Sequence, residues 1–285
     1  MTKYHHTEGI CLRRIEFSNT SQVASFLTPD AGRLSVIAKG VTRAPRKGIR
    51  TGFDLLGRYE LVYAARRTSS LQNLTYRWLR EDFRGVRRSL ERLLCGYYAA
   101  ELGLDFAAEG EPCPPLYDAV LRSLRGFAAG RKLGTTVLML ELAALREQGA
   151  VPRFDACAAC GKPLPSRGRV AFSFTDGGPL CRNCESTSQP RGTRGTPSAP
   201  PRSQGPKATA ELLRVLAVLS ANPDAEPPAL GPEETVAMSA LLRMHMRFLL
   251  GKELRMWKYL QGQKLTRSLD RLRRSIRARR ARRAG

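Results

Sequence analysis

Five short apolar segments, separated by turn residues, occupy the first eighty positions of the chain. They are GICLRRIEF (9–17), QVASFLT (22–28), RLSVIAKGV (33–41), FDLLGRYELVYAA (53–65) and SLQNLTYRWL (70–79). Asp30-Ala31-Gly32 supplies a turn between the second and third segments, because Gly32 can adopt a positive φ. Five strands at this spacing predict a small antiparallel barrel or sandwich in residues 1–80. Because the segment is also basic, we expect a five-stranded OB-fold, with an SH3-like barrel as the alternative.

From Glu81 onward the apolar residues recur at helical spacing. Phe83 to Leu102 follows this pattern, and Pro114-Pro115 starts a second helix. Residues 137–145 are apolar nearly all round, which predicts a central buried helix that Gly149 and Pro152 end. Helical spacing returns after residue 207. We therefore expect residues 81–152 and 207–262 to pack into one α-helical domain, giving an α+β multidomain chain.

Two segments have a composition that does not predict a packed core. Residues 186–206, STSQPRGTRGTPSAPPRSQGP, consist mainly of Ser, Thr, Pro, Gly and Arg, and we interpret them as a flexible linker. Residues 263–285 form an arginine-rich tail. Leu265, Leu269 and Leu272 recur in it at helical steps, which predicts a short amphipathic helix before a basic end that attracts DNA. A solvated tail, or one lying on an anionic membrane, is the alternative.

The charge of the chain points to a polyanionic partner. The 48 Lys and Arg exceed the 25 Asp and Glu by 23 in 285 residues. The excess lies at both ends: residues 1–80 hold 14 basic and 5 acidic side chains, and residues 256–285 hold 11 and 1. Nucleic acid is the usual partner of such a chain. The polar start MTKYHHTEGI and the short apolar runs predict no signal peptide and no membrane span, so we expect a cytoplasmic, nucleoid-associated protein.

A row of cations follows the third predicted strand with no acid between them. Its members are Lys39, Arg43, Arg46, Lys47 and Arg50. In an OB-fold the strand ends and neighbouring loops line the binding groove, so cations placed there reach phosphates directly. We take these five residues as the candidate DNA-binding residues; a solvated basic loop is the alternative. Tyr59, Tyr63 and Tyr76 could stack on bases, although core packing is expected for at least two of them.

Four cysteines are arranged as a metal site. Cys157-x2-Cys160 and Cys181-x2-Cys184 are separated by twenty residues. Two such pairs are typical of a zinc ribbon, in which four thiolates satisfy tetrahedral Zn²⁺ and leave no position for a substrate. The pattern predicts one structural zinc ion in a module spanning residues 153–185. A redox dithiol is the alternative. Cys11, Cys95 and Cys113 lack paired spacing, which predicts that they pack in the core.

The sequence offers little catalytic chemistry. It contains no Walker-type loop, HExxH or GxSxG motif, and only three histidines. Glu141 and Glu147 could form a pair of carboxylates, but Glu141 is equally well explained as the polar edge of a buried helix. We therefore predict a protein that is not an enzyme.

The order of these parts resembles the RecO family of bacterial recombination mediators over most of residues 1–260. The local matches are TPDAGRLSVIAKGVTR (28–43), LLGRYELVYAARRTSSLQNL (55–74) and HMRFLLGKELRMWKYL (245–260). Lys39 and Arg43 stand at the positions where the family has basic residues after this strand. The chain departs from the family at Ala44-Pro45-Arg46-Lys47, where a Ser-rich step is common, and at Met256, where Ser is common. The linker and the tail lie outside the resemblance.

The resemblance implies a protein that binds single- and double-stranded DNA and anneals strands coated with single-strand-binding protein. It also implies that the protein helps RecR to load the RecA recombinase. Some family members lack the cysteines, which agrees with a structural metal. The alternative function, from the residues alone, is a zinc-ribbon RNA-binding factor of the translation machinery.

Overall fold

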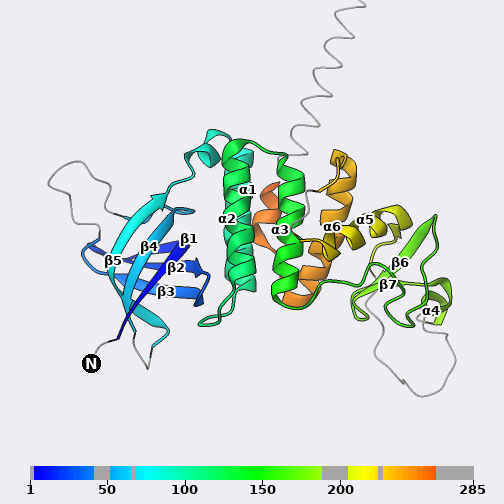
Figure 1. Ribbon diagram of the computed structural model, residues 1–285, viewed down its shortest axis with the longest axis horizontal. Coiled ribbons are helices and arrows are strands. Elements are labelled where there is room, and N and C mark those ends of the chain that lie inside the picture. Colours follow the sequence, from blue (N-terminus) through cyan, green and yellow to red (C-terminus); the bar gives the residue numbers. More distant parts are fainter. Residues whose placement is uncertain (1–2, 42–51, 66–68, 188–204, 224–226, 261–285) are drawn as a thin grey trace, which may run out of the picture.

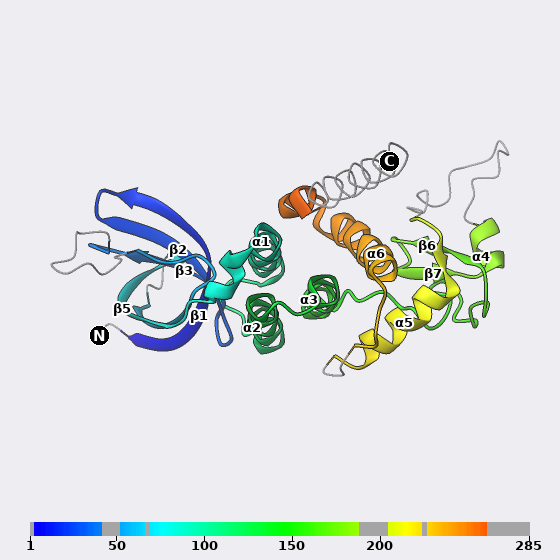
Figure 2. The same cartoon turned by 90° about the horizontal axis from the view of Figure 1, so that it is seen from above.

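The structure is a computed structural model that describes residues 3–41, 52–65, 69–187, 205–223 and 227–260. Its three parts lie in a row: a β-barrel at one end, a helical body in the middle and a small module containing β6 and β7 at the other end (Figure 1; Figure 2). The fold predicted from the sequence, an OB-like barrel followed by a helical domain with a four-cysteine insertion, is confirmed.

Five strands form the barrel, and they close in the order β1-β2-β3-β5-β4. They are β1 (Tyr4–Ser18), β2 (Ser21–Thr28), β3 (Gly32–Ala38), β4 (Arg58–Ala64) and β5 (Leu71–Glu81). Two details differ from the sequence prediction. β1 begins earlier than predicted because Tyr4 to Ile10 pair with β4. The barrel is also not wholly antiparallel, since β3 and β5 pair in parallel where the barrel closes.

Aromatic rings fill the barrel interior. Phe26, Phe53 and Tyr59 meet edge to face, with ring centroids 5.2 to 5.9 Å apart. This arrangement is a favourable one for aromatic quadrupoles. The opposite face of β1 and β2 contributes Leu12 and Leu27 to the core of the helical body. The barrel and the helices therefore share buried apolar surface.

The turn before β3 also joins the barrel to the helical body. Gly32 has a φ of +56°, as the sequence predicts, and a Cβ there would lie 2.3 Å from the carbonyl oxygen of Ala108. The next residue, Arg33, donates its main-chain N–H to the same oxygen at 2.9 Å. Any larger residue at position 32 would push the turn away from this contact.

The helical body begins with a short 3₁₀ helix, η1 (Arg84–Arg88). The longer helices are α1 (Leu90–Phe106), α2 (Pro114–Ala129), α3 (Leu133–Glu147), α5 (Ala210–Ala221) and α6 (Pro232–Leu250). The periodicity from Phe83 does not form one continuous helix, because Ser89 is extended and its Oγ accepts from the main-chain N–H of Arg92 at 3.3 Å. Helices from before and after the linker contribute to one core, as expected.

The module at the far end packs onto α6 through aromatic side chains. It contains β6 (Arg169–Ser173), β7 (Gly178–Leu180) and α4 (Arg182–Thr187), and β6 also pairs with β8 (Ala208–Thr209). Phe174 stacks on Phe248 with ring centroids 5.9 Å apart, and Phe172 meets His245 edge to face. The module therefore adds its small core to that of the helices.

Two segments singled out in the sequence fall mainly outside the described residues. They are the linker, of which 188–204 are not described, and the arginine-rich tail. The domain boundaries stay a prediction. Cys11, Cys95 and Cys113 are buried, as expected for packing residues. Among the described residues, no helix is both long and apolar enough to cross a membrane.

A buried ion pair lies at the centre of the helical body. Arg243 of α6 donates from Nη1 to Oε1 of Glu141 on α3 at 2.8 Å, and the Tyr98 hydroxyl of α1 donates to the same oxygen at 2.9 Å. Glu141 is 0% exposed and Arg243 6%. The guanidinium carbon of Arg243 lies 3.0 Å from the ring centroid of Trp257. The pair and its neighbours thus connect three helices and the segment that follows α6. Because Glu141 is buried, a substrate could not reach its carboxylate.

We expect Arg243→Ala to lower the free energy of unfolding by about 3–5 kcal/mol, because it leaves the Glu141 carboxylate buried without its cation. Urea unfolding measures this change. Arg247→Ala on the same helix is the matched control: Arg247 forms a 3.0 Å ion pair with Glu253 at the surface, and its loss should cost no more than about 1 kcal/mol. Equal effects of the two substitutions would contradict the structural importance of the buried pair. Replacing both Glu141 and Arg243 by Leu and Met should recover much of the loss.

Candidate metal centre and nucleic-acid interface

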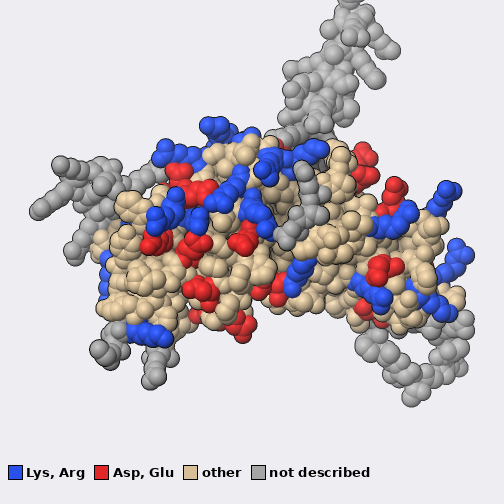
Figure 3. All heavy atoms as spheres, viewed as in Figure 1, with Lys and Arg blue, Asp and Glu red and all other residues tan. Residues whose placement is uncertain are grey.

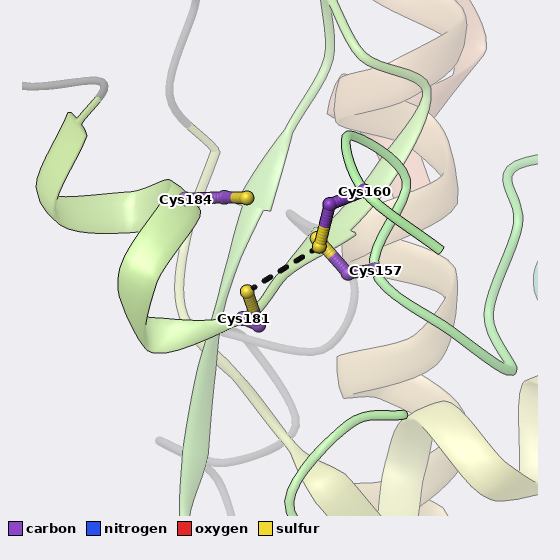
Figure 4. A group of neighbouring side chains, drawn as sticks. All are labelled: Cys157, Cys160, Cys181 and Cys184. Atoms are coloured by element: carbon purple, nitrogen blue, oxygen red, sulfur yellow. Dashed lines mark hydrogen bonds between the residues drawn. The ribbon is translucent and has the colours of Figure 1, made fainter. Parts of the chain in front are cut away.

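The four clustered cysteines come together at one end of the zinc-ribbon-like module. Cys157 and Cys160 lie in the loop before β6, Cys181 follows β7, and Cys184 lies in α4 (Figure 4). Their sulfur atoms all lie within 4.8 Å of one another, and those of Cys160 and Cys181 are 3.7 Å apart. The structure therefore brings together the four residues that the sequence singled out.

Tight turns in each cysteine pair aim the thiols at a common point. The main-chain N–H of Gly161 donates to the carbonyl of Cys157 at 2.8 Å, and Gly161 has a φ of +73°. In the second pair the N–H of Glu185 donates to the carbonyl of Cys181 at 2.9 Å. Each turn needs the two-residue spacing between cysteines, which explains the C-x-x-C pattern.

The electrostatics of the cluster favour a bound cation. Burial raises the pKa of Cys157, but hydrogen bonds from the main chain of Cys181, Cys160 and Ala159 outweigh it and lower the pKa to about 6. Thiol hydrogen bonds with Cys160 and Cys181 raise the pKa of Cys184 to about 12. A metal ion that binds here must displace the protons of the thiols, so metal binding should weaken as the pH falls. The donor set is all sulfur and complete, so the cluster could hold a metal ion in a closed site.

Lys39 is the one member of the candidate DNA-binding row that lies within the described residues. It directly follows β3, and its side chain is exposed. Arg43, Arg46, Lys47 and Arg50 lie outside the described residues. The structure therefore places the start of the basic row at the end of a barrel strand, and the assignment of these residues to DNA stays a prediction.

The tyrosines near the barrel divide as expected. Tyr59 and Tyr63 are buried, at 2% and 8% exposed, and pack in the barrel core, whereas Tyr76 is 49% exposed on β5. Trp78, two residues along the same strand, is 58% exposed. Between them, Arg77 lies over the Phe53 ring at 4.8 Å from its centroid. Because side chains alternate along a strand, Tyr76 and Trp78 both stand on the outer face of the barrel.

The parallel pairing of β3 with β5 places the end of β3, which Lys39 follows, beside β5. Ile37 pairs with Asn73, and both strands run onward in the same direction. Lys39 lies in the turn that follows Ala38, so the chain leaves β3 beside the part of β5 that leads on to Tyr76 and Trp78. Exposed cations and exposed aromatic rings are the chemistry that holds single-stranded nucleic acid: the cations meet phosphates and the rings stack on bases.

Acidic side chains next to this face are already paired. Glu60 of β4 lies opposite Trp78 and is bound by Arg80, and Glu8 of β1 is bound by Arg58. These pairs reduce the repulsion that free carboxylates would exert on a phosphate backbone. Trp78 was absent from the candidates chosen by sequence. The alternation Tyr76-Arg77-Trp78 is the signal that could have identified it, since it places both rings on one face.

Comparison with known proteins identifies relatives over nearly the whole described chain. Residues 1–80 match the family model for the Recombination protein O N terminal, and residues 87–258 match that for the Recombination protein O C terminal. DNA repair protein RecO of Rhodopirellula baltica is 36% identical over 178 residues, which are 62% of this chain and 65% of the relative. DNA repair protein RecO of Anaeromyxobacter sp. (strain K) is 32% identical over 244 residues, which are 84% of this chain and 90% of the relative.

Proposed function

Because this chain belongs to the RecO family of DNA repair proteins, we propose that it is a non-enzymatic, DNA-binding mediator of recombination. It binds single- and double-stranded DNA, anneals complementary strands and helps to load the recombinase together with RecR. The observation that carries the proposal is the outer face of β5, where Tyr76 and Trp78 are exposed, next to the end of β3, which the exposed Lys39 follows.

This face suits a single strand better than a duplex. The faces of Tyr76 and Trp78 attract unpaired bases, which a duplex keeps stacked inside. Cations contribute attraction to phosphates in either form of DNA, so duplex binding depends on charge alone and is more sensitive to salt. Arg43, Arg46, Lys47 and Arg50 would extend the phosphate contacts from Lys39.

The partners of the chain follow from the family. We propose that it acts on strands covered by single-strand-binding protein, contacts RecR and serves RecA indirectly, in the cytoplasm and at the nucleoid. The support is the family relationship together with the absence, among the described residues, of a helix suited to a membrane. An RNA-binding factor of the translation machinery is the competing function, and the binding experiment below separates it from DNA repair.

We propose that the metal is one structural Zn²⁺, bound by Cys157, Cys160, Cys181 and Cys184. When bound, the ion supplies a crosslink between the loop before β6 and the α4 segment and carries out no reaction, because its four positions are filled. The proposal rests on two observations: all four donors are thiols, and their sulfur atoms lie within 4.8 Å of one another.

Elemental analysis should find about one zinc per chain in reduced protein purified without added metal. Cys160→Ser should lower the zinc content and the melting temperature, because the metal-binding energy contributes to folding. It should leave DNA affinity per folded molecule unchanged. Cys113→Ala, which removes a cysteine outside the cluster, is the control and should keep the metal. Less than about half an equivalent of zinc in the unchanged protein would refute the site.

Trp78→Ala should weaken binding to oligothymidine by about 1–3 kcal/mol, because one stacking contact is lost. Fluorescence anisotropy of a labelled oligonucleotide measures the affinity. Tyr259→Ala is the matched control, since this ring is 62% exposed but belongs to the segment after α6. The chain has two tryptophans, Trp78 and Trp257, and Arg243 covers the latter. Oligothymidine should therefore quench the intrinsic fluorescence, and Trp78→Phe should abolish most of that quenching.

The same assay tests Lys39 and the competing function. Changing Lys39 and Arg43 together to Ala should reduce the slope of log affinity against log salt by about 0.7 for each lost phosphate contact. Weaker binding with an unchanged slope would mean that these residues do not contact phosphates. If structured RNA displaces single-stranded DNA from the unchanged protein, the proposed DNA function is wrong.

A further inference from the structure

A second group of cations lies where the barrel meets the helical body. Arg87 and Arg88 belong to η1, and Arg131 and Lys132 occupy the turn between α2 and α3. We call these four residues the arginine corner. η1 and the α2–α3 turn both lie at the upper end of the helices in Figure 1, and Lys and Arg side chains gather along that edge in Figure 3. The four residues are all exposed.

Close backbone packing fixes the arginine corner. Gly85 of η1 lies so near the end of α2 that a Cβ there would be 2.3 Å from the carbonyl oxygen of Ala128. Arg92 donates to that same oxygen at 3.3 Å. Its guanidinium also covers Gly130, where a Cβ would be 2.3 Å from Nη2. The cations of η1 and of the α2–α3 turn are therefore held side by side by packed elements.

The arginine corner keeps its positive charge. Arg87 donates to two main-chain carbonyls, those of Asp82 at 3.0 Å and Leu55 at 3.2 Å. Within the described part of the chain, Arg88, Arg131 and Lys132 form no ion pair. The acids closest in sequence are engaged in contacts of their own.

The three acids closest in sequence to η1 are Glu81, Asp82 and Glu91. Arg84 pairs with Asp82 at 2.5 Å and Arg125 pairs with Glu81 at 2.8 Å. Glu91 is partly buried in the first turn of α1. The corner therefore presents more positive charge than its surroundings neutralise, which is a condition for attracting a polyanion.

The corner continues the aromatic face of the barrel. β5 carries Tyr76 and Trp78, ends at Glu81 and leads directly into η1. The bidentate contact of Arg125 with Glu81 ties α2 to the end of β5. Because β5 leads into η1, a strand that follows β5 past Trp78 would run toward the arginine corner.

We propose that the arginine corner binds the sugar–phosphate backbone of single-stranded DNA as the strand leaves the barrel. The inference rests on the proposed function and extends it from the barrel onto the helical body. One strand is then held at two places, by base stacking at Tyr76 and Trp78 and by phosphate contacts at the corner. Only strands longer than the barrel site use the second place.

The test compares oligothymidines of about 8 and about 30 nucleotides, since a single OB-fold covers roughly 4–16. A variant with Arg87, Arg88, Arg131 and Lys132 changed to Gln should bind the short oligonucleotide within about twofold of the unchanged protein. It should bind the long one at least about tenfold more weakly at low salt, with a salt slope reduced by about 0.7 per lost contact. Quenching of Trp78 by the short oligonucleotide should persist.

Two controls separate a local site from general charge. Changing Lys162, Arg167, Arg182 and Arg214 to Gln removes the same charge from exposed positions in and beside the module, and should leave both affinities nearly unchanged. Changing the three arginines of the corner to Lys keeps the charge and should preserve long-strand binding. Equal losses in the two Gln variants, or equal losses for short and long oligonucleotides, would overturn the corner proposal.

Different experimental results would refute the corner proposal and the proposed function. If the unchanged protein binds and Trp78 is quenched, but the corner variant binds long strands normally, only the corner proposal is wrong. If the unchanged protein neither binds oligothymidine nor shows quenching, the proposed function is wrong and the corner proposal falls with it. Circular dichroism melting curves confirm that each variant is folded.

Discussion

The helical body depends on one buried ion pair, between Glu141 and Arg243. A carboxylate that is 0% exposed is costly to bury without a cation and hydrogen bonds, and here Arg243 and Tyr98 both donate to its Oε1 from two other helices. The pair therefore specifies how α1, α3 and α6 are arranged, because another arrangement would leave a charge buried alone. Trp257 completes the arrangement by covering the Arg243 guanidinium.

That body holds the two other parts in fixed positions. On one side Leu12 and Leu27 of the barrel enter its core, and on the other Phe172 and Phe174 of the module pack against α6. Arg125 and Glu81 connect α2 to the end of β5 beside the exposed aromatic face. For the proposed annealing function such rigidity would be useful, because a strand held in a fixed, extended path keeps its bases available for pairing. The four-cysteine cluster lies in the module, at the end far from the barrel, and the metal ion proposed for it would crosslink that module.

Much of the fold could be predicted from the sequence because its signals are local. The five barrel segments carry the strand pattern, Pro114 and Gly149 mark helix boundaries, and the cysteine spacing defines a cluster before any coordinates are known. Tertiary features were not predictable in this way. Glu141 could equally be a helix edge until Arg243, about a hundred residues away, is placed beside it. Ser89 interrupts a continuous helical pattern because η1 must pack on α2. Trp78 was not among the residues chosen from the sequence, because only the closed barrel shows that its ring stands outward. The arginine corner joins residues more than forty positions apart.

If DNA strands lie on the outer face of the barrel, this contact should support annealing. An annealing time course with complementary strands coated by single-strand-binding protein measures this support. We expect the unchanged protein to accelerate duplex formation on coated strands and Trp78→Ala to slow it, while Tyr259→Ala does not. No acceleration of coated strands, or equal rates for Trp78→Ala and the unchanged protein, would refute strand binding at this face.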